Sequence, residues 1–201
     1  MVRLTALGAL AIFLGVLPPA RAAADDADWP CAQRHTGPIS AAAIWAGPEV
    51  AQAGAWEDDA EAAALARKLA SRRTPIVDVD GLIDDFAKKA GPDKSTRLTR
   101  VFAGMLDLLN SDRNRIIEGV VRYARGQSLL ADKIRADADR IGDEQEKGDA
   151  PPHAIEEARS ALQWDKRIFD ERARSLSYVC ETPVLLERRA FEIARKIQER
   201  L

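Results

Sequence analysis

The chain has 201 residues, of which 31% are charged and 5% are aromatic, and its formal net charge is -2 at pH 7. This composition favours elongated, well-solvated helices over a thick globular core. The slight excess of acid predicts no nucleic-acid partner, because binding to phosphates requires a basic surface.

Residues 1–22 have the pattern of a secretory signal peptide: Arg3, an apolar run over 4–17, a Pro18-Pro19 breaker and the small-residue site Ala20-Arg21-Ala22. The run of about 14 residues is shorter than the about 20 that span a bilayer, which favours a cleaved signal over an uncleaved anchor. We therefore expect a periplasmic protein with no membrane insertion after cleavage. Without Arg3 and Arg21, the chain has 28 basic and 32 acidic residues, which gives a net charge of -4. The length of the remaining chain predicts that residues 23–201 form one domain.

The exported chain has two cysteines, Cys31 and Cys180. An oxidising compartment favours a disulfide between them. Closing a loop of about 150 residues contributes about 5 kcal/mol in the chain-entropy model. The alternative, a redox-active pair, lacks the C-x-x-C spacing that such pairs usually have.

Three short helices are expected before residue 91. Residues 40–46 allow a brief helix among proline and glycine punctuation, and residues 57–71 form an alanine-rich amphipathic helix with acids in its first turn. A further helix follows Thr74-Pro75 and ends before Gly91-Pro92, with Val79, Leu82, Ile83, Phe86 and Ala90 on one face.

From Ser95 onward the chain predicts a long helical hairpin. In the first arm the apolar positions are separated by threes and fours, a period that strands cannot have: Leu98, Phe102, Met105, Leu109, Ile116, Val120, Tyr123, Leu130, Ile134 and Ile141. The turn falls at Gly148-Asp149-Ala150-Pro151-Pro152, and the second arm carries apolar residues at strict sevens: Ile155, Leu162, Phe169 and Leu176. Each residue of the first arm then faces the residue at about 297 minus its own number, which places Cys180 opposite about Ile117.

The fold class is therefore all-α: a long antiparallel hairpin with two short helices packed on its base and a protruding coiled-coil finger. The base comprises residues 23–124 with 176–201, where apolar residues are dense, and the finger comprises residues 125–175, which have a thin seam and many charges. Pro183 lies inside the second arm and predicts a kink or a short break there.

Signals for chemistry are weak throughout. Neither His35 nor His153 has a second metal ligand at helical spacing, and Asp78-Val79-Asp80-Gly81 fails as a calcium loop because Ile76 and Ala87 fall where carboxylates are required. No nucleotide-binding or hydrolase motif is present in the sequence. We therefore expect no catalytic residue, no metal site, no cofactor and no enzyme activity.

A surface patch is the candidate binding site. Trp164 lies about 200° around the helix from the seam residue Leu162, Ile168 follows one turn later, and Leu129 lies beside the seam of the opposite arm. Exposed in a two-helix finger, these side chains would form a contact site for a protein partner. The alternative is that the amino-terminal segment, with Trp29, Trp45 and Trp56, covers them by a close approach at Gly119 and Gly126.

The pattern Trp29-Pro30-Cys31-x-Gln33, followed by Trp45-x-Gly47-Pro48, resembles the amino-terminal region of secreted helical proteins of proteobacteria. The resemblance covers the first fifty or so residues and is loose over the helical remainder. It implies a periplasmic address and brings no catalytic residue to this chain.

Three functions fit these observations, and the sequence does not specify the oligomeric state. The first is a non-enzymatic scaffold or adaptor that presents a helical finger to a protein partner or envelope complex. The second is a holdase-like chaperone, which would suppress the aggregation of unfolded clients. The third is a small-molecule or metal carrier, which its ligand would stabilise against heat.

Overall fold

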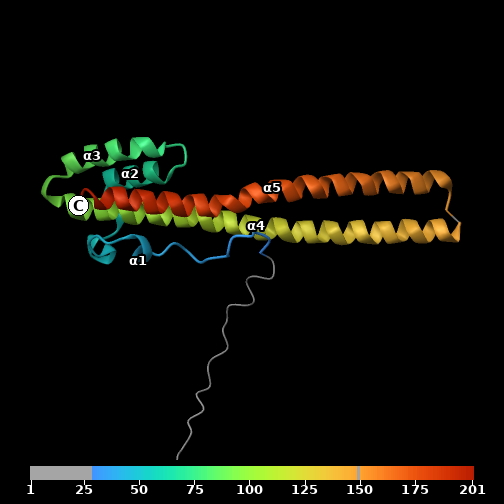
Figure 1. Cartoon of the computed structure of the whole chain (residues 1–201). Helices are drawn as coiled ribbons and strands as arrows, with labels where there is room; N and C mark the ends of the chain where they lie inside the picture. Colours follow the sequence, from blue (N-terminus) through green and yellow to red (C-terminus); the bar gives the residue numbers. More distant parts are fainter. Residues whose placement is uncertain (1–28, 149) are drawn as a thin grey trace, which may run out of the picture.

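The computed structural model describes residues 29–148 and 150–201, and its regular structure within these ranges is helical. Two long antiparallel helices dominate it, α4 (Lys94–Lys147) and α5 (Pro152–Gln198) (Figure 1). Before them come α1 (Ala41–Ile44), α2 (Ala60–Ala70) and α3 (Val79–Ala90), with the 3-10 turns η2 (Val50–Ala53), η3 (Trp56–Asp58), η4 (Ile76–Asp78) and η5 (Gly91–Asp93). The predicted all-α hairpin is confirmed, and the predicted signal peptide lies outside the described residues.

The turn of the hairpin falls where the glycine and the two prolines predict it. Gly148 ends α4 with φ +70°, a left-handed conformation that glycine adopts without steric cost, and its N–H donates to Glu144 O at 3.2 Å. Pro152 begins α5, a position where its missing N–H and fixed φ are tolerated. The two arms have 54 and 47 residues, so they match closely in length.

Hydrogen bonds between the arms confirm the register. Gln127 Nε2 donates to Phe169 O at 3.0 Å, and Tyr123 Oη donates to Arg172 O at 3.2 Å. The predicted partners are positions 170 and 174. The arms therefore pair within two positions of the register derived from the turn.

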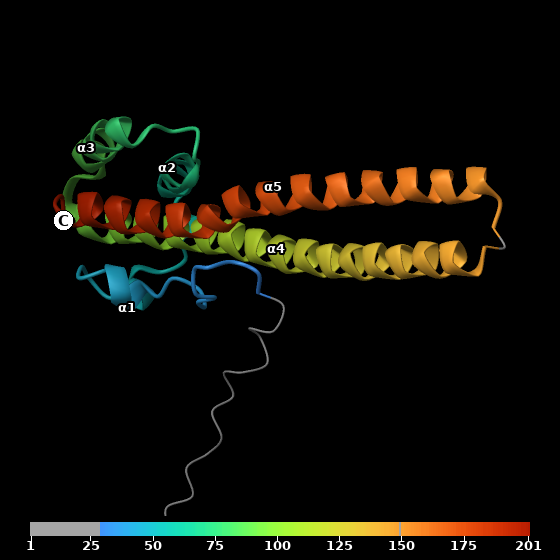
Figure 2. The ribbon, with the colours of Figure 1, turned by 45° about the vertical axis from the view of Figure 1, so that its right-hand side comes forward.

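The helix α5 continues through Pro183 without a break. Its red base half lies close along α4, whereas its orange finger half diverges from it, so the axis changes direction between the two (Figure 2). A proline removes one hydrogen bond and crowds the preceding turn, which bends a helix without ending it. Of the two predicted outcomes, the structure has the bend and not the break.

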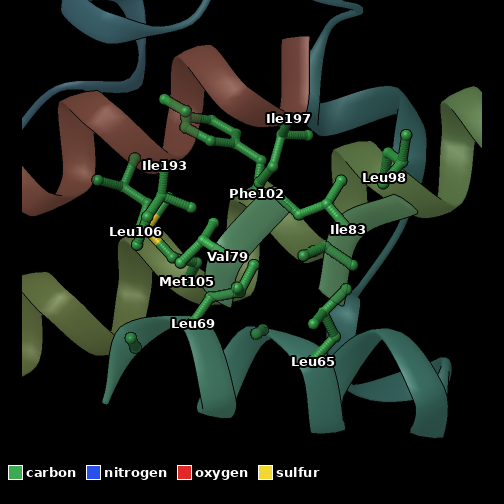
Figure 3. Close-up of a cluster of buried hydrophobic side chains, with 14 of the residues drawn as sticks. Leu65, Leu69, Val79, Ile83, Leu98, Phe102, Met105, Leu106, Ile193 and Ile197 are labelled. Atoms are coloured by element: carbon green, nitrogen blue, oxygen red, sulfur yellow. The ribbon is translucent and has the colours of Figure 1, made fainter. Parts of the chain in front are cut away.

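The hydrophobic core lies in the base, where α2 and α3 cover one face of the hairpin (Figure 3). Leu65 and Leu69 of α2 and Val79 and Ile83 of α3 belong to one buried cluster with residues of the two long helices. The arms contribute residues from two matched stretches: Leu98, Val101, Phe102, Met105, Leu106 and Leu109 from α4, with Leu186, Ala190, Ile193, Ala194 and Ile197 from α5. This is the predicted four-helix base.

The described chain ahead of α2, from residue 29 onward, covers the opposite face of the hairpin, as both ribbon views show (Figures 1 and 2). Near α1, the Trp45 ring stacks on Phe102 with centroids 4.0 Å apart and an interplanar angle of 9°. The residues 29–39, which we call the strap, run along the hairpin toward the finger. The two faces of the base are therefore closed by segments from different parts of the sequence.

A disulfide and several hydrogen bonds hold the strap to the hairpin. A disulfide joins Cys31 to Cys180, with Cα atoms 5.6 Å apart, as the sequence predicts. Asn110 exchanges two hydrogen bonds with the backbone of Ile39, at 2.8 and 3.0 Å. Arg113, whose side chain is 2% exposed, donates to Gly37 O at 2.9 Å and to Glu187 Oε1 at 2.7 Å, so one guanidinium links strap, α4 and α5.

Candidate functional site

The finger consists of residues 125–175 of the two arms, and a thin and partly polar seam holds the arms together there. Gln127 and Ile141 are buried in it, whereas Leu130, Ile134, Leu162 and Phe169 are half-buried. Lys133 Nζ crosses between the arms to Asp165 Oδ2 at 2.6 Å. Little apolar area stabilises this part of the molecule, because most of its remaining side chains are exposed.

Hydrogen bonds between charged side chains shift the pKa values of Lys133 and Asp137, two groups beside the predicted contact residues. The hydrogen bond to Asp137, and then that to Asp165, raises the pKa of the Lys133 ammonium. The same Lys133 contact lowers the pKa of the Asp137 carboxyl. The patch therefore lies among groups that stay charged at neutral pH, which keeps this part of the rod well solvated.

Two large apolar side chains stand out on this rod. Trp164 is 59% exposed and Leu129 is 70% exposed, whereas Ile168 is half-buried. The guanidinium carbon of Arg167 lies 5.9 Å from the centroid of the Trp164 ring, a distance at which a cation is attracted to the ring face. The structure thus exposes two of the three predicted contact residues, Leu129 and Trp164, and leaves Ile168 half-buried.

Helical geometry places these residues on one side of the finger. Leu129 precedes the seam residue Leu130 by one position, and Ile168 likewise precedes Phe169. In an antiparallel pair, a twofold axis perpendicular to the plane of the two helices relates one helix to the other. Residues that precede a seam residue by one position on each helix therefore lie on the same side of the pair. Trp164 lies one turn beyond Ile168, about 6 Å along the axis. We call Leu129, Trp164 and Ile168 the finger patch.

The amino-terminal tryptophans do not cover the finger patch, so that alternative is wrong for the described residues. Trp45 stacks on Phe102 in the base, and Trp56 Nε1 donates to Asp107 Oδ2 at 3.0 Å. Trp29 stacks on His35 with centroids 4.8 Å apart. Trp45 and Trp56 therefore attach the amino-terminal segment to the base, whereas Trp29 lies in the strap and lines a groove with Gln127 and Phe169.

The predicted role of two glycines is also corrected. A Cβ on Gly126 would meet nothing within 4 Å, and one on Gly119 would meet a single atom of Arg122 at 3.9 Å. The close approach occurs instead at Gly104, where a Cβ would lie 2.7 Å from the Trp56 ring. Gly104 lies within the core-forming stretch of α4, and its lack of a side chain is the sequence signal that could have located Trp56.

Sequence reasoning missed a groove between the strap and the hairpin. It has a volume of about 690 Å³ and is lined on the strap side by Trp29 and Gln33 and on the hairpin side by Gln127, Phe169 and Glu181. Both cysteines of the disulfide belong to the lining. No local motif marks the groove, because it forms only when residues about 100 positions apart are brought together by the fold.

Two further classes of site are absent from the described part of the chain. Over residues 29–148 and 150–201, no three His, Cys, Asp or Glu side chains gather as a metal site would require. Among the helices so described, none combines the length and the apolar character needed to cross a bilayer. The Cys31–Cys180 disulfide is consistent with an oxidising compartment outside the cytoplasm.

Comparison of the chain with protein-family models, with curated proteins and with the solved structures gives no match. Functional inference therefore rests on the finger patch, argued from its own residues.

Proposed function

We propose that this protein is a non-enzymatic periplasmic scaffold or adaptor whose finger presents a contact surface to a protein partner. One observation carries the proposal: Trp164 and Leu129 are exposed on a charged rod that extends well beyond the hydrophobic core. Burying a tryptophan against a partner contributes a large apolar area, and tryptophan is enriched among the residues that dominate binding energy.

The shape of the molecule supports this function. Core residues from the arms come from 98–109 and 186–197, so the base folds around its own contacts and the finger adds little to the core. Because the finger contributes little to the core, folding does not explain its length. Extending a contact surface toward a partner is the simplest explanation. The predicted signal peptide and the disulfide support a periplasmic location for that partner.

The proposal is tested with a photocrosslinking amino acid placed at Trp164 in cells that export the protein. The matched control places the same amino acid at Lys166, an exposed residue about 200° around α5 from Trp164. An adaptor gives one or a few discrete crosslinked species at Trp164 and none at Lys166. Equal or absent crosslinking at the two positions would contradict a patch-specific partner.

The same experiment separates an adaptor from a holdase. A holdase-like chaperone gives a broad smear of products, because many unfolded clients contact it, and it suppresses client aggregation at substoichiometric amounts. With a purified partner, Trp164→Ala is expected to weaken binding at least tenfold and Lys166→Ala by less than twofold. The unfolding midpoints of both variants should stay close to that of the unsubstituted protein, because both side chains are exposed.

A further inference from the structure

The finger patch lies at the centre of a longer stripe on α5. The members of this stripe are four, three, four and four positions apart, which keeps them within an arc of about 80° on an α-helix. The arc is centred about 110° from the seam residues, so the stripe faces one side of the finger rather than the other arm. Its members are exposed, except for the half-buried Ile168. We call these residues the outer stripe: Glu157, Ala161, Trp164, Ile168 and Arg172.

The outer stripe has an acid at the end near the tip of the finger, a base at the other end and apolar side chains between them. Over the ranges 29–148 and 150–201, neither Glu157 nor Arg172 forms an ion pair. Two copies that pack in opposite directions would therefore place each Glu157 beside the Arg172 of the other copy, which is favourable. A parallel pair would place like charges together, which is unfavourable.

Pairing Glu157 with Arg172 determines the register of the two helices. Each residue of one α5 then lies opposite the residue at about 329 minus its own number in the other copy. Ile168 therefore packs on Ala161 of the other copy, a large side chain on a small one. The two Trp164 side chains meet beside the twofold axis, so the surface is complementary to itself. Leu129 of α4 lies on the same side of the finger and borders this contact.

The charge of the whole finger has the same polarity as the outer stripe. On the tip side of the axis, residues 134–147 and 150–163 include seven acids and four bases, a net charge of -3. On the base side, residues 119–132 and 165–178 include six bases and four acids, a net charge of +2. In the antiparallel pair, the acidic half of each finger lies along the basic half of the other, so the charges attract.

The base leaves room for this arrangement. On the same register, Ala150 at the turn of one copy lies beside Val179 of the other, a residue that is 43% exposed. Arg189, which donates to Leu69 O at the end of α2, is ten positions further along α5, about 15 Å away. Figure 1 shows α2 and α3 over the base half of the hairpin, where they end before the finger begins. The short helices therefore do not block the turn of a second copy.

We propose that this protein forms an antiparallel dimer through the outer stripes of two fingers, so that the partner of the finger patch is a second copy of the chain. The inference rests on the proposed role of the finger patch as a contact surface and names what occupies it. Such a dimer holds two bases at opposite ends of a four-helix rod, which is a scaffold in the literal sense.

The size of the contact sets the expected strength of the dimer. A contact over about 30 residues of α5 is about 45 Å long, and at a helix width of about 10 Å it covers about 450 Å² on each copy. The total of about 900 Å² lies at the low end of specific interfaces, so we expect dissociation in the micromolar range.

Sedimentation equilibrium of the oxidised mature protein across the micromolar range tests the proposal, and a monomer–dimer equilibrium is expected. Glu157→Arg and Arg172→Glu each place like charges at both ends of the contact, so each should weaken the dimer at least tenfold. An equimolar mixture of the two variants restores both opposite-charge pairs. It should form a heterodimer about as tight as the dimer of the unsubstituted protein.

Matched controls reverse charges on the far side of α5. Lys166 and Asp170 are exposed and lie about 160° around the helix from the centre of the outer stripe. Lys166→Glu and Asp170→Arg should change the dissociation constant by less than twofold. Because the four substituted side chains are exposed, circular dichroism should show the same helix content in every variant.

Two results would overturn the dimer: a chain that stays monomeric throughout the micromolar range, or a dimer that neither Glu157→Arg nor Arg172→Glu weakens. The adaptor function is judged separately by photocrosslinking at Trp164. A monomeric chain that crosslinks a different protein there refutes the pairing of fingers and leaves the adaptor standing, whereas equal crosslinking at Trp164 and Lys166 refutes the finger patch as a contact surface.

Discussion

At the scale of single residues, Asp59 shows how one carboxylate serves two structural purposes. It caps α2 by accepting from the Ala62 N–H at 3.0 Å, and it receives Arg97 Nε at 2.6 Å and Nη2 at 3.0 Å. The Arg97 hydrogen bonds, working against burial and aided by the Ala62 N–H, lower the pKa of Asp59 to about 2. The charged form of this side chain is thus specifically stabilised in the folded protein.

This residue predicts a pH dependence of stability. Because the folded-state pKa of Asp59 lies below its unfolded value of about 4, its contribution is present above pH 4 and is lost as the pH falls toward 2. We expect Asp59→Asn, which keeps a capping side chain, to lower the free energy of unfolding by about 2 kcal/mol at pH 7 and by much less at pH 2. Urea denaturation at both values measures the difference.

The matched control is Asp58→Asn, one position earlier and exposed. It should change the free energy of unfolding by less than about 0.5 kcal/mol at either pH. A constant deficit for Asp59→Asn from pH 7 to pH 2 would mean that its ion pair with Arg97 does not contribute.

The sequence predicts the helix-capping role of Asp59 but not its ion pair with Arg97. Acids ahead of an alanine-rich segment predict a helix start, and Asp59 is such an acid. Arg97 lies 38 positions away, and nothing local to either residue specifies that they meet. The same limit applies to Arg113, whose burial against Glu187 and the strap depends on three segments that are distant in the sequence.

At the scale of elements, the strap is the segment whose order depends most on a single covalent bond. It has no regular structure between Trp29 and Ile39, and it is held by the disulfide at one end and by Asn110 and Arg113 at the other. A segment with so few internal hydrogen bonds gains its order from attachments to the helices.

We expect the double variant Cys31→Ser, Cys180→Ser to lower the free energy of unfolding by about 3–5 kcal/mol, because the bond closes a loop of 149 residues. Hydrogen exchange should accelerate first at residues 31–35, ahead of the Arg113 and Asn110 contacts. Guanidinium denaturation gives the free energy, and exchange followed by mass spectrometry gives the location.

Reducing the unsubstituted protein with dithiothreitol should reproduce both effects, whereas the reductant should leave the double variant unchanged. A loss below about 1 kcal/mol would show that the reduced chain already holds the strap in place.

The long elements were predictable, and their neighbours were less so. Leu162, Phe169 and Leu176 at sevens, with Gly148 and two prolines at the turn, specify arms and register through local rules. The position of the Trp56 side chain could not be predicted, because it depends on the packing of η3 against α4 at Gly104. The groove at Gln127 required the position of the strap, which depends on the disulfide and on two hydrogen-bonding side chains far along the chain.

At the scale of the whole molecule, the base and the finger differ in what stabilises them. The buried hydrophobic cluster draws on α2, α3 and the base portions of α4 and α5, and it ends at Leu109 and Leu186. Beyond it, the arms are joined by a few seam residues and by ion pairs such as Lys133–Asp165, whose exposure limits their contribution to about 0–1 kcal/mol each. The base therefore supplies most of the free energy of folding.

This division predicts that the finger can be shortened without loss of the fold. Removing residues 134–147 and 153–166, two heptads from each arm, keeps the native turn at 148–152 and preserves the pairing of the arms. We expect the unfolding midpoint to fall by no more than a few degrees, since Ile141 is the one apolar side chain in the deleted stretches that is classed as buried. Thermal unfolding followed by circular dichroism measures it.

The control removes two heptads from one arm only, over residues 134–147, which leaves the other arm without a partner. It should aggregate or expose the seam around Leu162, because an unpaired amphipathic helix leaves its apolar stripe in water. The matched deletion should also shorten the maximum dimension of the monomer in solution scattering by about 20 Å, from a rise of about 1.5 Å per residue. A matched deletion that unfolds at room temperature would show that the finger stabilises the base, and the length of the rod would then have a structural cause independent of any partner.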